Sequence, residues 1–343
     1  MDSWKERYIS ALCEEIKRYP KTDIVDTIYF GGGTPTVLKP ESLGKILDVI
    51  KEKFCITKDC EITFECNPAT IGEKGFKKLK DYGVNRVSIG LQSANNDMLK
   101  FIGRIHSFED FSKCFNDARN GGFDNISLDL IFGLPNQAEE DWKNTLKKAV
   151  KFNPEHISCY ALKVEDGTPF AEMDLQLPDD DLSRNLYDMT IKYLKENGYN
   201  QYEISNFSRN GLNSRHNCRY WKCMDYAGFG AGAYSCVENK RYSNILDVPK
   251  YCEFIEENKS VVLDIDRLSA EDKMSEFCFL GLRMTAGISK SEFKDRFGRE
   301  IESIYGDVIE KNIKRGTLVL KDNRIYIPKE WLYVSNGILV DFV

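Results

Sequence analysis

The chain has 343 residues, of which 42% are hydrophobic and 30% charged, and its formal net charge is −6. This length is enough to bury a full core, and we expect one large domain with a smaller appendage. No stretch approaches the roughly 20 apolar residues of a membrane helix, and the acidic balance argues against a nucleic-acid surface. Charged residues follow Met1 without an apolar signal region, so the sequence predicts a cytoplasmic protein.

Helical and strand patterns alternate over the first 165 residues, with a period of about 35 residues that is typical of repeated βα units. The patterns predict strands at 24–30, 61–65, 86–90, 126–132 and 156–162, and helices at 4–16, 40–54, 73–82, 108–120 and 139–152. Parallel strands joined by right-handed crossovers close into a barrel or half-barrel, which presents ligand groups at the carboxyl ends of its strands. We therefore expect an α/β fold of this kind.

Polar or glycine residues stand where each of these five strands ends. They are Gly31 to Thr34 after the first strand, Glu65 and Asn67 after the second, Gln92 after the third, Asp129 with Gly133 to Pro135 at the fourth, and Tyr160 with Ala161 at the fifth. Glycines allow the backbone to come close to a ligand. Taken singly, Glu65 could be a solvated strand residue and Asp129 a structural acceptor. Their joint placement predicts a rim that binds a polar small molecule.

The pattern changes after residue 165. We predict a helix at 182–197, a short strand at 201–205, a polar loop at 214–221 that carries His216, and a glycine-rich run at 228–233. A helix at 270–283, a helix pair through 293–309 and a hairpin at 317–327 then resemble a winged-helix module. Residues 266–343 carry thirteen acidic and thirteen basic side chains. Because a neutral charge balance does not favour binding to DNA, we predict that this unit serves in packing or in contact with a partner.

Eleven cysteines are scattered along the chain at spacings that match neither a zinc C-x2-C pair nor a cluster-binding C-x3-C-x2-C triplet. The nearest approach is Cys55, Cys60 and Cys66, and the last two flank a predicted strand. We therefore interpret the cysteines as small buried hydrophobic residues and predict no metal cluster among them.

The ordered motifs resemble the HemN/HemW branch of the radical SAM proteins. They are GGGTP from Gly31, FECNP from Phe64, NRVSIGLQS from Asn85, Gly103-Arg104, SLDLIFGLP from Ser127 and the Gly-Phe-Gly run from Gly228. Two further runs, QYEISNF from Gln201 and HNCRYW from His216, are similar to the haem chaperones of the branch, whose H-N-x-x-Y-W motif is associated with haem binding. The oxygen-independent coproporphyrinogen III oxidases are the related enzymes.

The resemblance implies a partial TIM-like radical SAM barrel that lacks its first strand, followed by a small helical, winged-helix-like domain. It divides the chain into a radical SAM core at 1–165, an extension with the H-N-x-x-Y-W motif at 166–265 and a C-terminal HemN-type domain at 266–343. We expect these three parts in that order.

The resemblance also assigns S-adenosylmethionine (SAM) to the predicted rim. Gly32, Gly33 and Thr34 would take the methionine ammonium, and Arg104 would hold the carboxylate as a bidentate fork. The remaining SAM contacts would come from Glu65, Asp129, Gln92 and Ala161, of which the two carboxylates suit ribose hydroxyls. HemN-type sites hold up to two SAM molecules, and which molecule each residue touches stays open.

One feature of the family is missing from these 343 residues. Members bind a [4Fe-4S] cluster through a C-x3-C-x2-C motif on the loop after the first strand, and this sequence holds no such motif. Three thiolates are needed to hold that cluster, and the cluster supplies the electron that cleaves SAM. We therefore expect no radical catalysis from this chain as written.

His216 is the candidate axial ligand of haem iron, with Tyr220 and Trp221 close enough in sequence to cover a macrocycle. The alternative is a surface histidine whose aromatic neighbours anchor a loop. Cys218 is a second candidate ligand, whereas His106 and His156 have weaker claims because of their turn and strand positions.

Three functions stay open: a haem chaperone that delivers haem to haemoproteins, an oxygen-independent coproporphyrinogen III oxidase of porphyrin biosynthesis, and a SAM-binding remnant of either. We favour the chaperone, because the run from His216 to Trp221 is intact while the cluster motif is not. The expected partners are haem, SAM and a haem-accepting protein, without nucleic acid or a membrane span. A homo-oligomer is a further open expectation.

Overall fold

The computed structural model describes residues 2–33 and 35–343. The described chain forms two compact units, each built from separate stretches of sequence. The first unit takes in residues 2–28, 38–61 and 214–343, and the second takes in residues 29–37 and 62–213. Strands β1 (Ile24–Phe30) and β2 (Cys55–Cys66) begin in the first unit and end in the second.

The second unit is built on parallel strands. Strand β2 pairs with β3 (Arg86–Gln92), β3 with β4 (Ile126–Phe132) and β4 with β5 (His156–Ala161), all in parallel. Two short antiparallel strands, β7 (Asn206–Ser208) and β6 (Asn200–Gln201), extend the sheet, so that its order is β1-β2-β3-β4-β5-β7-β6. This architecture confirms the α/β prediction of a sheet of repeated βα units.

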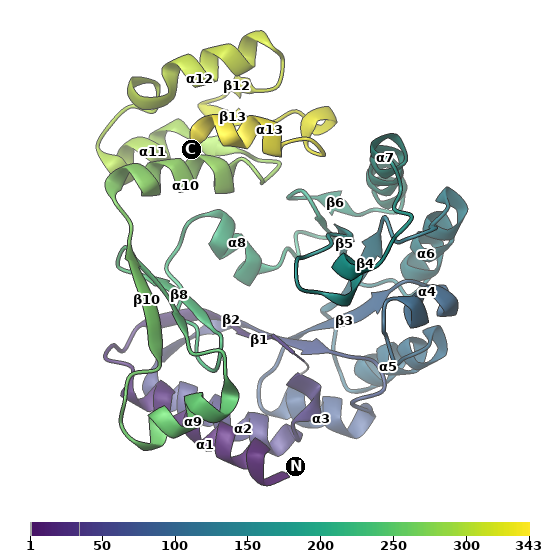
Figure 1. Cartoon of the computed structure of the whole chain (residues 1–343), viewed down its shortest axis with the longest axis vertical. Coiled ribbons are helices and arrows are strands. Elements are labelled where there is room, and N and C mark those ends of the chain that lie inside the picture. The colour runs from purple at the N-terminus through teal and green to yellow at the C-terminus, as the bar shows by residue number, and fades with distance from the viewer. Residues whose placement is uncertain (1, 34) are drawn as a thin grey trace. The chain divides into compact units, whose positions relative to one another are not determined.

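Helices cover the outer side of strands β3 to β5 (Figure 1). They are α3 (Glu73–Asp81), α5 (Phe108–Asn120), α6 (Glu139–Lys151) and α7 (Asp180–Glu196), with a short α4 (Asn96–Phe101) between β3 and α5. Helix α5 illustrates the cause: its buried residues recur at helical spacing, and a capping box of Ser107 and Asp110 satisfies its first amide groups. The predicted helix at 108–120 and the predicted strands at 24–30 and 126–132 are confirmed at both ends.

In the first unit, α1 (Asp2–Arg18), α2 (Pro40–Lys53) and α9 (Val248–Glu256) lie side by side (Figure 1). The carboxylate of Glu15 joins distant segments there: it accepts hydrogen bonds from the Tyr251 hydroxyl at 2.5 Å, the Asn244 amide at 2.6 Å and the Gly230 N–H at 2.8 Å. An aromatic group of Tyr19, Phe54 and Phe229 adds a second link, with ring centroids 5.4 to 6.1 Å apart.

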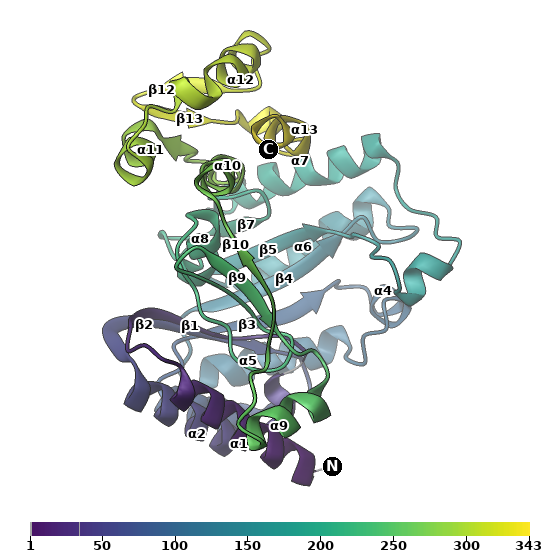
Figure 2. The ribbon, with the colours of Figure 1, turned by 60° about the vertical axis from the view of Figure 1, so that its left-hand side comes forward.

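A three-stranded antiparallel sheet follows, in the order β10-β9-β8. Figure 2 shows β9 beside β10. Its strands are β8 (Tyr234–Val237), β9 (Lys240–Asn244) and β10 (Val262–Arg267). The C-terminal part combines helices with a small sheet of order β11-β13-β12. It comprises α10 (Ala270–Gly281), β11 (Ile288–Ser289), α11 (Lys290–Phe297), α12 (Glu302–Lys314), β12 (Val319–Lys321), β13 (Arg324–Tyr326) and α13 (Asn336–Leu339). Short 3-10 turns lie at Pro35–Val37, Pro169–Glu172, Lys329–Trp331 and Val340–Phe342.

Two predicted elements are wrong. The segment at 214–221 is not a loop but helix α8 (Arg215–Trp221), which begins at the capping residue Ser214. The predicted strand at 201–205 is a strand only at Gln201, where β6 ends. The chain then turns back before β7 begins at Asn206: Tyr202 N–H bonds to Asn206 O at 3.1 Å, and Ser205 N–H bonds to the Glu203 carboxylate at 3.0 Å. The three-part division at 1–165, 166–265 and 266–343 stays a prediction, because it divides the chain linearly and the compact units are discontinuous.

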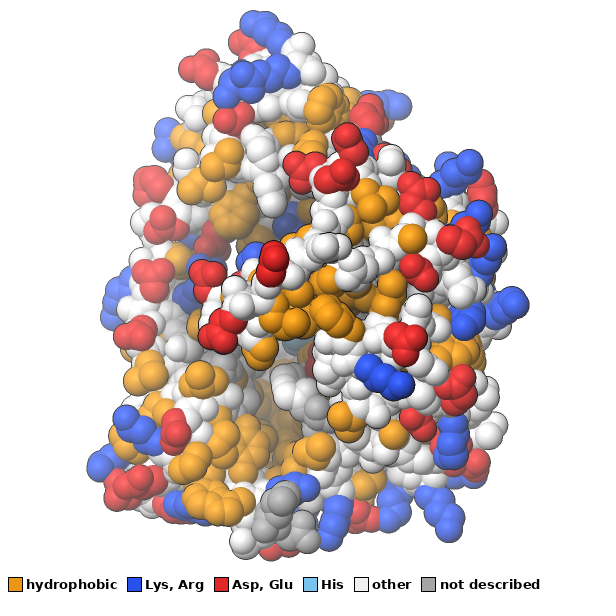
Figure 3. Space-filling view, turned by 45° about the vertical axis from the view of Figure 1, so that its right-hand side comes forward, with side chains coloured by type: hydrophobic (Ala, Val, Ile, Leu, Met, Phe, Trp, Pro, Cys, Tyr) orange, Lys and Arg blue, Asp and Glu red, His pale blue; other side chains and the backbone are white. Residues whose placement is uncertain are grey.

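The surface mixes charges of both signs. On the face that Figure 3 shows, Lys and Arg side chains are interspersed with Asp and Glu side chains, and apolar side chains lie among them. That face therefore offers no continuous basic stripe. Within residues 2–33 and 35–343, no helix is long and apolar enough to cross a membrane.

Candidate functional site

The glycine turn after β1 is open to a ligand. Gly32 and Gly33 have φ angles of +78° and +55°, in the left-handed region that favours glycine, and a Cβ atom added to either would meet nothing within 4 Å. Gly31 differs, because a Cβ atom there would lie 2.6 Å from the Tyr29 ring. The turn is thus packed at its first residue and free at the next two. Thr34, the last residue predicted for this site, lies outside the described residues.

Glu65 fixes this turn to the end of β2. Its carboxylate accepts a hydrogen bond from the Tyr29 hydroxyl at 2.6 Å and one from the Gly32 N–H at 3.3 Å. Burial raises the pKa of Glu65, and the bond from Tyr29 opposes the rise. Burial also raises the pKa of the Tyr29 phenol, so this hydroxyl stays a hydrogen-bond donor.

Asp129 on β4 is the second carboxylate of this rim. It accepts hydrogen bonds from the hydroxyls of Ser88, at 2.9 Å, and Ser158, on the two neighbouring strands. Burial raises the pKa of Asp129. The two serine bonds and the charges of Arg86 and Arg104 oppose that rise. The structure therefore holds a partly buried carboxylate that two hydroxyls orient.

Gln92 ends β3 in an uncommon conformation. It is 7% exposed, and its φ angle of +64° lies in the left-handed region, where non-glycine residues are rare and concentrate at functional sites. A Cβ atom on Gly90 would lie 2.8 Å from the Gln92 side-chain nitrogen, so the Gln92 amide folds back over Gly90. Glycine at position 90 is what makes room for this amide.

The two remaining residues predicted for the rim are Arg104, which lies in a loop, and Ala161, which lies at the end of a strand. Arg104 is partly buried in the loop between α4 and α5, close enough for its charge to act on the pKa of Asp129. Ala161 is exposed at the end of β5, paired in register with Phe132. Within the second unit, a hydrogen bond thus joins Gly32 to Glu65. The charge of Asp129 raises the pKa of Tyr29, and the charge of Arg104 opposes the rise in the pKa of Asp129.

Histidine 216 belongs to the first unit and lies on helix α8. Its ring nitrogen Nδ1 is 3.0 Å from the Thr27 hydroxyl, and Nε2 is 3.0 Å from the Tyr220 hydroxyl one helical turn later. We assign the ring proton to Nδ1, donating to Thr27 Oγ1, so that Nε2 accepts the hydrogen bond from Tyr220. Both ring nitrogens are then engaged, and the ring is held rather than free on a loop.

The start of α8 is tied to β1 and β2. The Glu61 carboxylate accepts hydrogen bonds from the backbone N–H of Arg215 at 3.1 Å and of His216 at 3.0 Å, and it is 6% exposed. Further along the helix, Arg219 forms an ion pair with Asp26 at 2.6 Å. A seven-residue helix is marginal alone, so these contacts define where His216 lies.

The other two histidines are buried. His156 is buried between the hydroxyls of Ser127, at 2.7 Å, and Tyr202, at 2.9 Å, and burial lowers its pKa well below the usual value. His106 is also buried, and burial lowers its pKa. Cys218 is buried on α8. His216 therefore stays the predicted haem ligand.

Sequence reasoning missed the partners of these residues. Thr27, Glu61 and Tyr29 each contact a site residue across a gap in sequence, and no local pattern marks them. Ser88 lies in the motif NRVSIGLQS, two residues before Gly90 on β3. That position was the signal that could have marked it as a partner of Asp129.

The rim can be compared with what SAM requires. Open space at Gly32 and Gly33, two oriented carboxylates and a nearby guanidinium suit an ammonium, ribose hydroxyls and a carboxylate. A [4Fe-4S] cluster has no such match: among residues 2–33 and 35–343, no group of three or more His, Cys, Asp or Glu side chains could hold a metal ion.

Comparisons with known proteins agree with the fold and the motifs. The model of the radical SAM superfamily matches residues 3–149, and the model of the HemN C-terminal domain matches residues 268–330. The haem chaperone HemW of Bacillus subtilis is 35% identical over 346 residues, covering 98% of this chain and 91% of the relative. That of Lactococcus lactis is 34% identical over 342 residues, covering 98% and 89%.

Among solved structures, the coproporphyrinogen III oxidase HemN of Escherichia coli, described as a radical SAM enzyme, is similar with a TM-score of 0.85. The match covers 98% of this chain and 82% of that chain at 22% identity. At this identity the likeness concerns the fold.

Proposed function

The chain belongs to the HemW family of haem chaperones within the radical SAM proteins, and we propose that it binds haem through His216 and delivers it to haemoproteins. The proposal is supported by relatives of that name that match nearly the whole chain at 34–35% identity. It is also supported by the H-N-x-x-Y-W motif, whose histidine lies on a helix anchored at both ends.

The observation that carries the proposal is the setting of the His216 ring. A neutral imidazole ligates haem iron through one nitrogen, and a hydrogen bond from the other fixes the tautomer and the orientation of the ring. Thr27 accepts that bond from Nδ1 in our assignment, so Nε2 carries the lone pair. An axial bond from Nε2 to iron would replace the hydrogen bond from Tyr220.

We propose that the rim of the second unit binds SAM. Gly32 and Gly33, with Thr34, would receive the ammonium group, and Arg104 the carboxylate. Glu65 and Asp129 would accept the ribose hydroxyls, and Gln92 and Ala161 would complete the contacts. When loaded with a cluster, radical SAM proteins use SAM as a radical source; the binding function proposed here invokes no cluster.

The haem-accepting protein, the cytoplasmic compartment and the oligomeric state stay predictions. The alternative of an oxygen-independent coproporphyrinogen III oxidase is supported by likeness to HemN at the level of the fold, and no side chain described above favours it over the chaperone.

The test is a titration of the purified chain with hemin, followed by Soret absorption, beside His216→Ala. We expect a saturable, near-stoichiometric shift in the unchanged chain and its loss in the variant. Cys218→Ala serves as the matched control on the same helix, and its shift should equal that of the unchanged chain, because the Cys218 thiol is buried. Equal shifts for the unchanged chain and His216→Ala would remove His216 from the haem site.

A further inference from the structure

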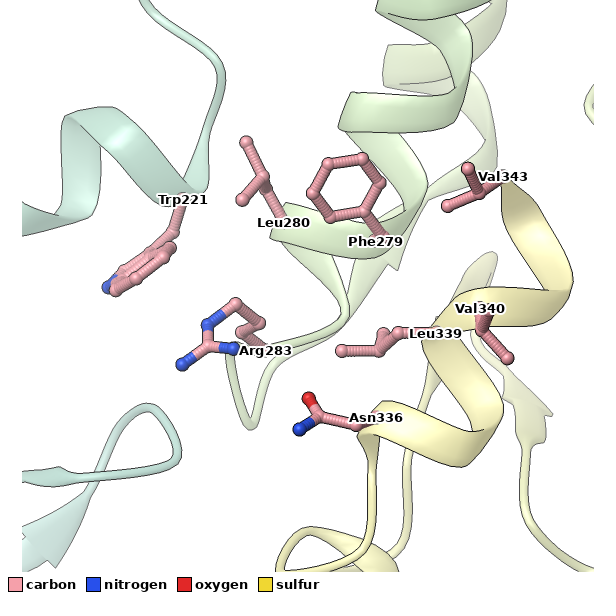
Figure 4. A pocket seen from close by; sticks show the side chains of 8 residues that line it. All are labelled: Trp221, Phe279, Leu280, Arg283, Asn336, Leu339, Val340 and Val343. Atoms are coloured by element: carbon pink, nitrogen blue, oxygen red, sulfur yellow. The ribbon is translucent and has the colours of Figure 1, made fainter. Parts of the chain in front are cut away.

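The C-terminal part of the first unit contains an apolar pocket that the proposed function does not use. Its volume is about 480 Å³, within the range of small-molecule sites. Six of its eight described lining side chains are apolar (Figure 4), among them Trp221, Phe279, Leu280, Leu339 and Val340. The two polar ones are Arg283 and Asn336.

Arg283 has no acidic side chain beside it among the described residues that line this pocket. Its guanidinium carbon lies 4.7 Å from the centroid of the Trp221 ring, and no hydrogen bond or ion pair joins it to another described residue. Figure 4 shows its side chain between Trp221 and Leu339. Because a charge beside an apolar surface is poorly solvated, this setting favours an anionic partner supplied by a ligand.

Arg7 offers a comparison within the same chain, because its guanidinium is also stacked on a tryptophan ring. The guanidinium carbon of Arg7 lies 4.9 Å from the Trp4 ring, nearly the same stacking distance. Arg7, however, also forms a two-bond ion pair with the Glu256 carboxylate, at 2.6 Å for each bond. The carboxylate that completes the Arg7 stack is the group that the Arg283 stack lacks.

Helix α8 connects this pocket to the haem motif. His216 and Trp221 are five residues apart, which on an α-helix corresponds to about 140° of rotation. His216 points toward Thr27 of β1, whereas Trp221 lines the pocket beside α10. The motif thus contributes to two faces of one helix, and the pocket is distinct from the iron-ligand position.

We propose that this pocket binds a porphyrin that carries propionate groups, with the ring against Trp221 and Phe279 and a carboxylate on Arg283. An aromatic and aliphatic wall suits a planar apolar ring, and a guanidinium beside that wall suits a carboxylate. The inference rests on the proposed function, because that function makes the ligand a tetrapyrrole rather than another apolar acid.

The test uses protoporphyrin IX, which has both propionates but no iron, so that His216 ligation plays no part. Its fluorescence is titrated with the unchanged chain, Arg283→Gln and Arg283→Lys. We expect saturable binding by the unchanged chain, at least tenfold weaker binding by Arg283→Gln, and partial recovery with lysine. Arg7→Gln is the matched control, since it removes the other arginine stacked on a tryptophan, and its affinity should be unchanged.

The dimethyl ester of protoporphyrin IX tests the carboxylate itself. We expect the ester to bind weakly and equally to the unchanged chain and to Arg283→Gln. Equal affinity of the acid for these two proteins, or ester binding as tight as acid binding, would overturn the proposal. Because the probe lacks iron, such a failure leaves the hemin result for His216 standing, so the two outcomes are distinguishable.

Discussion

Thr27 is the residue that orients the imidazole of His216. Its hydroxyl lies 3.0 Å from Nδ1, and hydrogen bonds of this kind set both the tautomer and the ligand strength of metal-binding histidines. Thr27→Val keeps the branched shape and removes the acceptor. We expect hemin affinity to fall about tenfold, at the lower end of the range for loss of such partners, in a Soret titration.

Tyr220 should act in the opposite direction. Its hydroxyl occupies Nε2, the nitrogen that would ligate iron, so Tyr220→Phe should strengthen hemin binding while leaving the ring packing in place. The same Soret titration checks this expectation. If Thr27→Val and Tyr220→Phe both bind hemin like the unchanged chain, the tautomer assigned to His216 is wrong.

We expect Asp129 to lower the stability of the folded chain while strengthening its binding of SAM. Its pKa is raised by burial, so the folded state holds the proton more tightly than the unfolded state. That contribution to stability is present below the ordinary pKa of about 4 and is lost as the pH rises through the raised pKa. Asp129→Asn should therefore melt about 2 °C higher at pH 8.

The difference in melting temperature between Asp129→Asn and the unchanged chain should shrink at pH 5. Calorimetry should show that the variant binds SAM at least fivefold more weakly, because a charged acceptor has become neutral. Differential scanning fluorimetry at the two pH values measures the first effect. A lower melting temperature of the variant at pH 8 would contradict this account.

At the level of residues, the sequence predicted a set of rim residues from their places on or after the strands of one sheet. The structure joins two of them, Gly32 and Glu65, by a hydrogen bond, and their role in binding SAM stays a prediction. Their partners were not predictable, since a hydroxyl such as that of Thr27 acquires its role only when α8, far along the chain, lies beside it.

At the level of elements, α8 is one of the two segments that sequence reasoning assigned wrongly. Its polar composition and seven-residue length favoured a loop, because local helix propensity is weak over so few residues. Contacts from elsewhere stabilise it: Glu61 of β2 accepts its first two amide protons, and Ser214 caps it. The long helices have a strong apolar periodicity that shows in the local sequence, and they were predicted correctly.

Glu61→Ala should therefore damage both stability and haem binding. It leaves two partly buried N–H groups without an acceptor and removes a negative charge from a helix N-terminus, at a cost of about 1–3 kcal/mol. Urea unfolding should show that loss, and hemin affinity should fall because the start of α8 no longer fixes His216. Glu61→Gln, which keeps an acceptor oxygen, should lose less in both measurements. Equal losses in the two variants would contradict the hydrogen-bond explanation.

At the level of the whole molecule, the compact units are not continuous in sequence. The first unit joins α1 and α2 to residues 214–343 through contacts such as those of Glu15 with Tyr251 and Asn244. A single sequence shows the order of elements but not which distant side chains meet. The βα order could therefore be predicted, whereas the discontinuous units could not.

The division into units predicts where each ligand leaves its mark in hydrogen exchange. The described SAM-rim residues belong to the second unit, and Thr27, His216 and Arg283 belong to the first. A ligand at 100 times its dissociation constant stabilises the state that binds it by about 2.7 kcal/mol, which slows exchange of amides that open with that state. SAM should therefore protect peptides within 62–213, and hemin should protect peptides within 214–343.

Hemin added to His216→Ala is the control for non-specific adsorption, and it should give less protection of the α8 peptides than the unchanged chain shows. Peptides of β1 and β2 report on both ligands, because these strands begin in one unit and end in the other. If SAM slowed exchange mainly within 214–343, the rim at Gly32, Glu65 and Asp129 would not be its binding site. The two ligands thus test the two proposed sites separately in one protein.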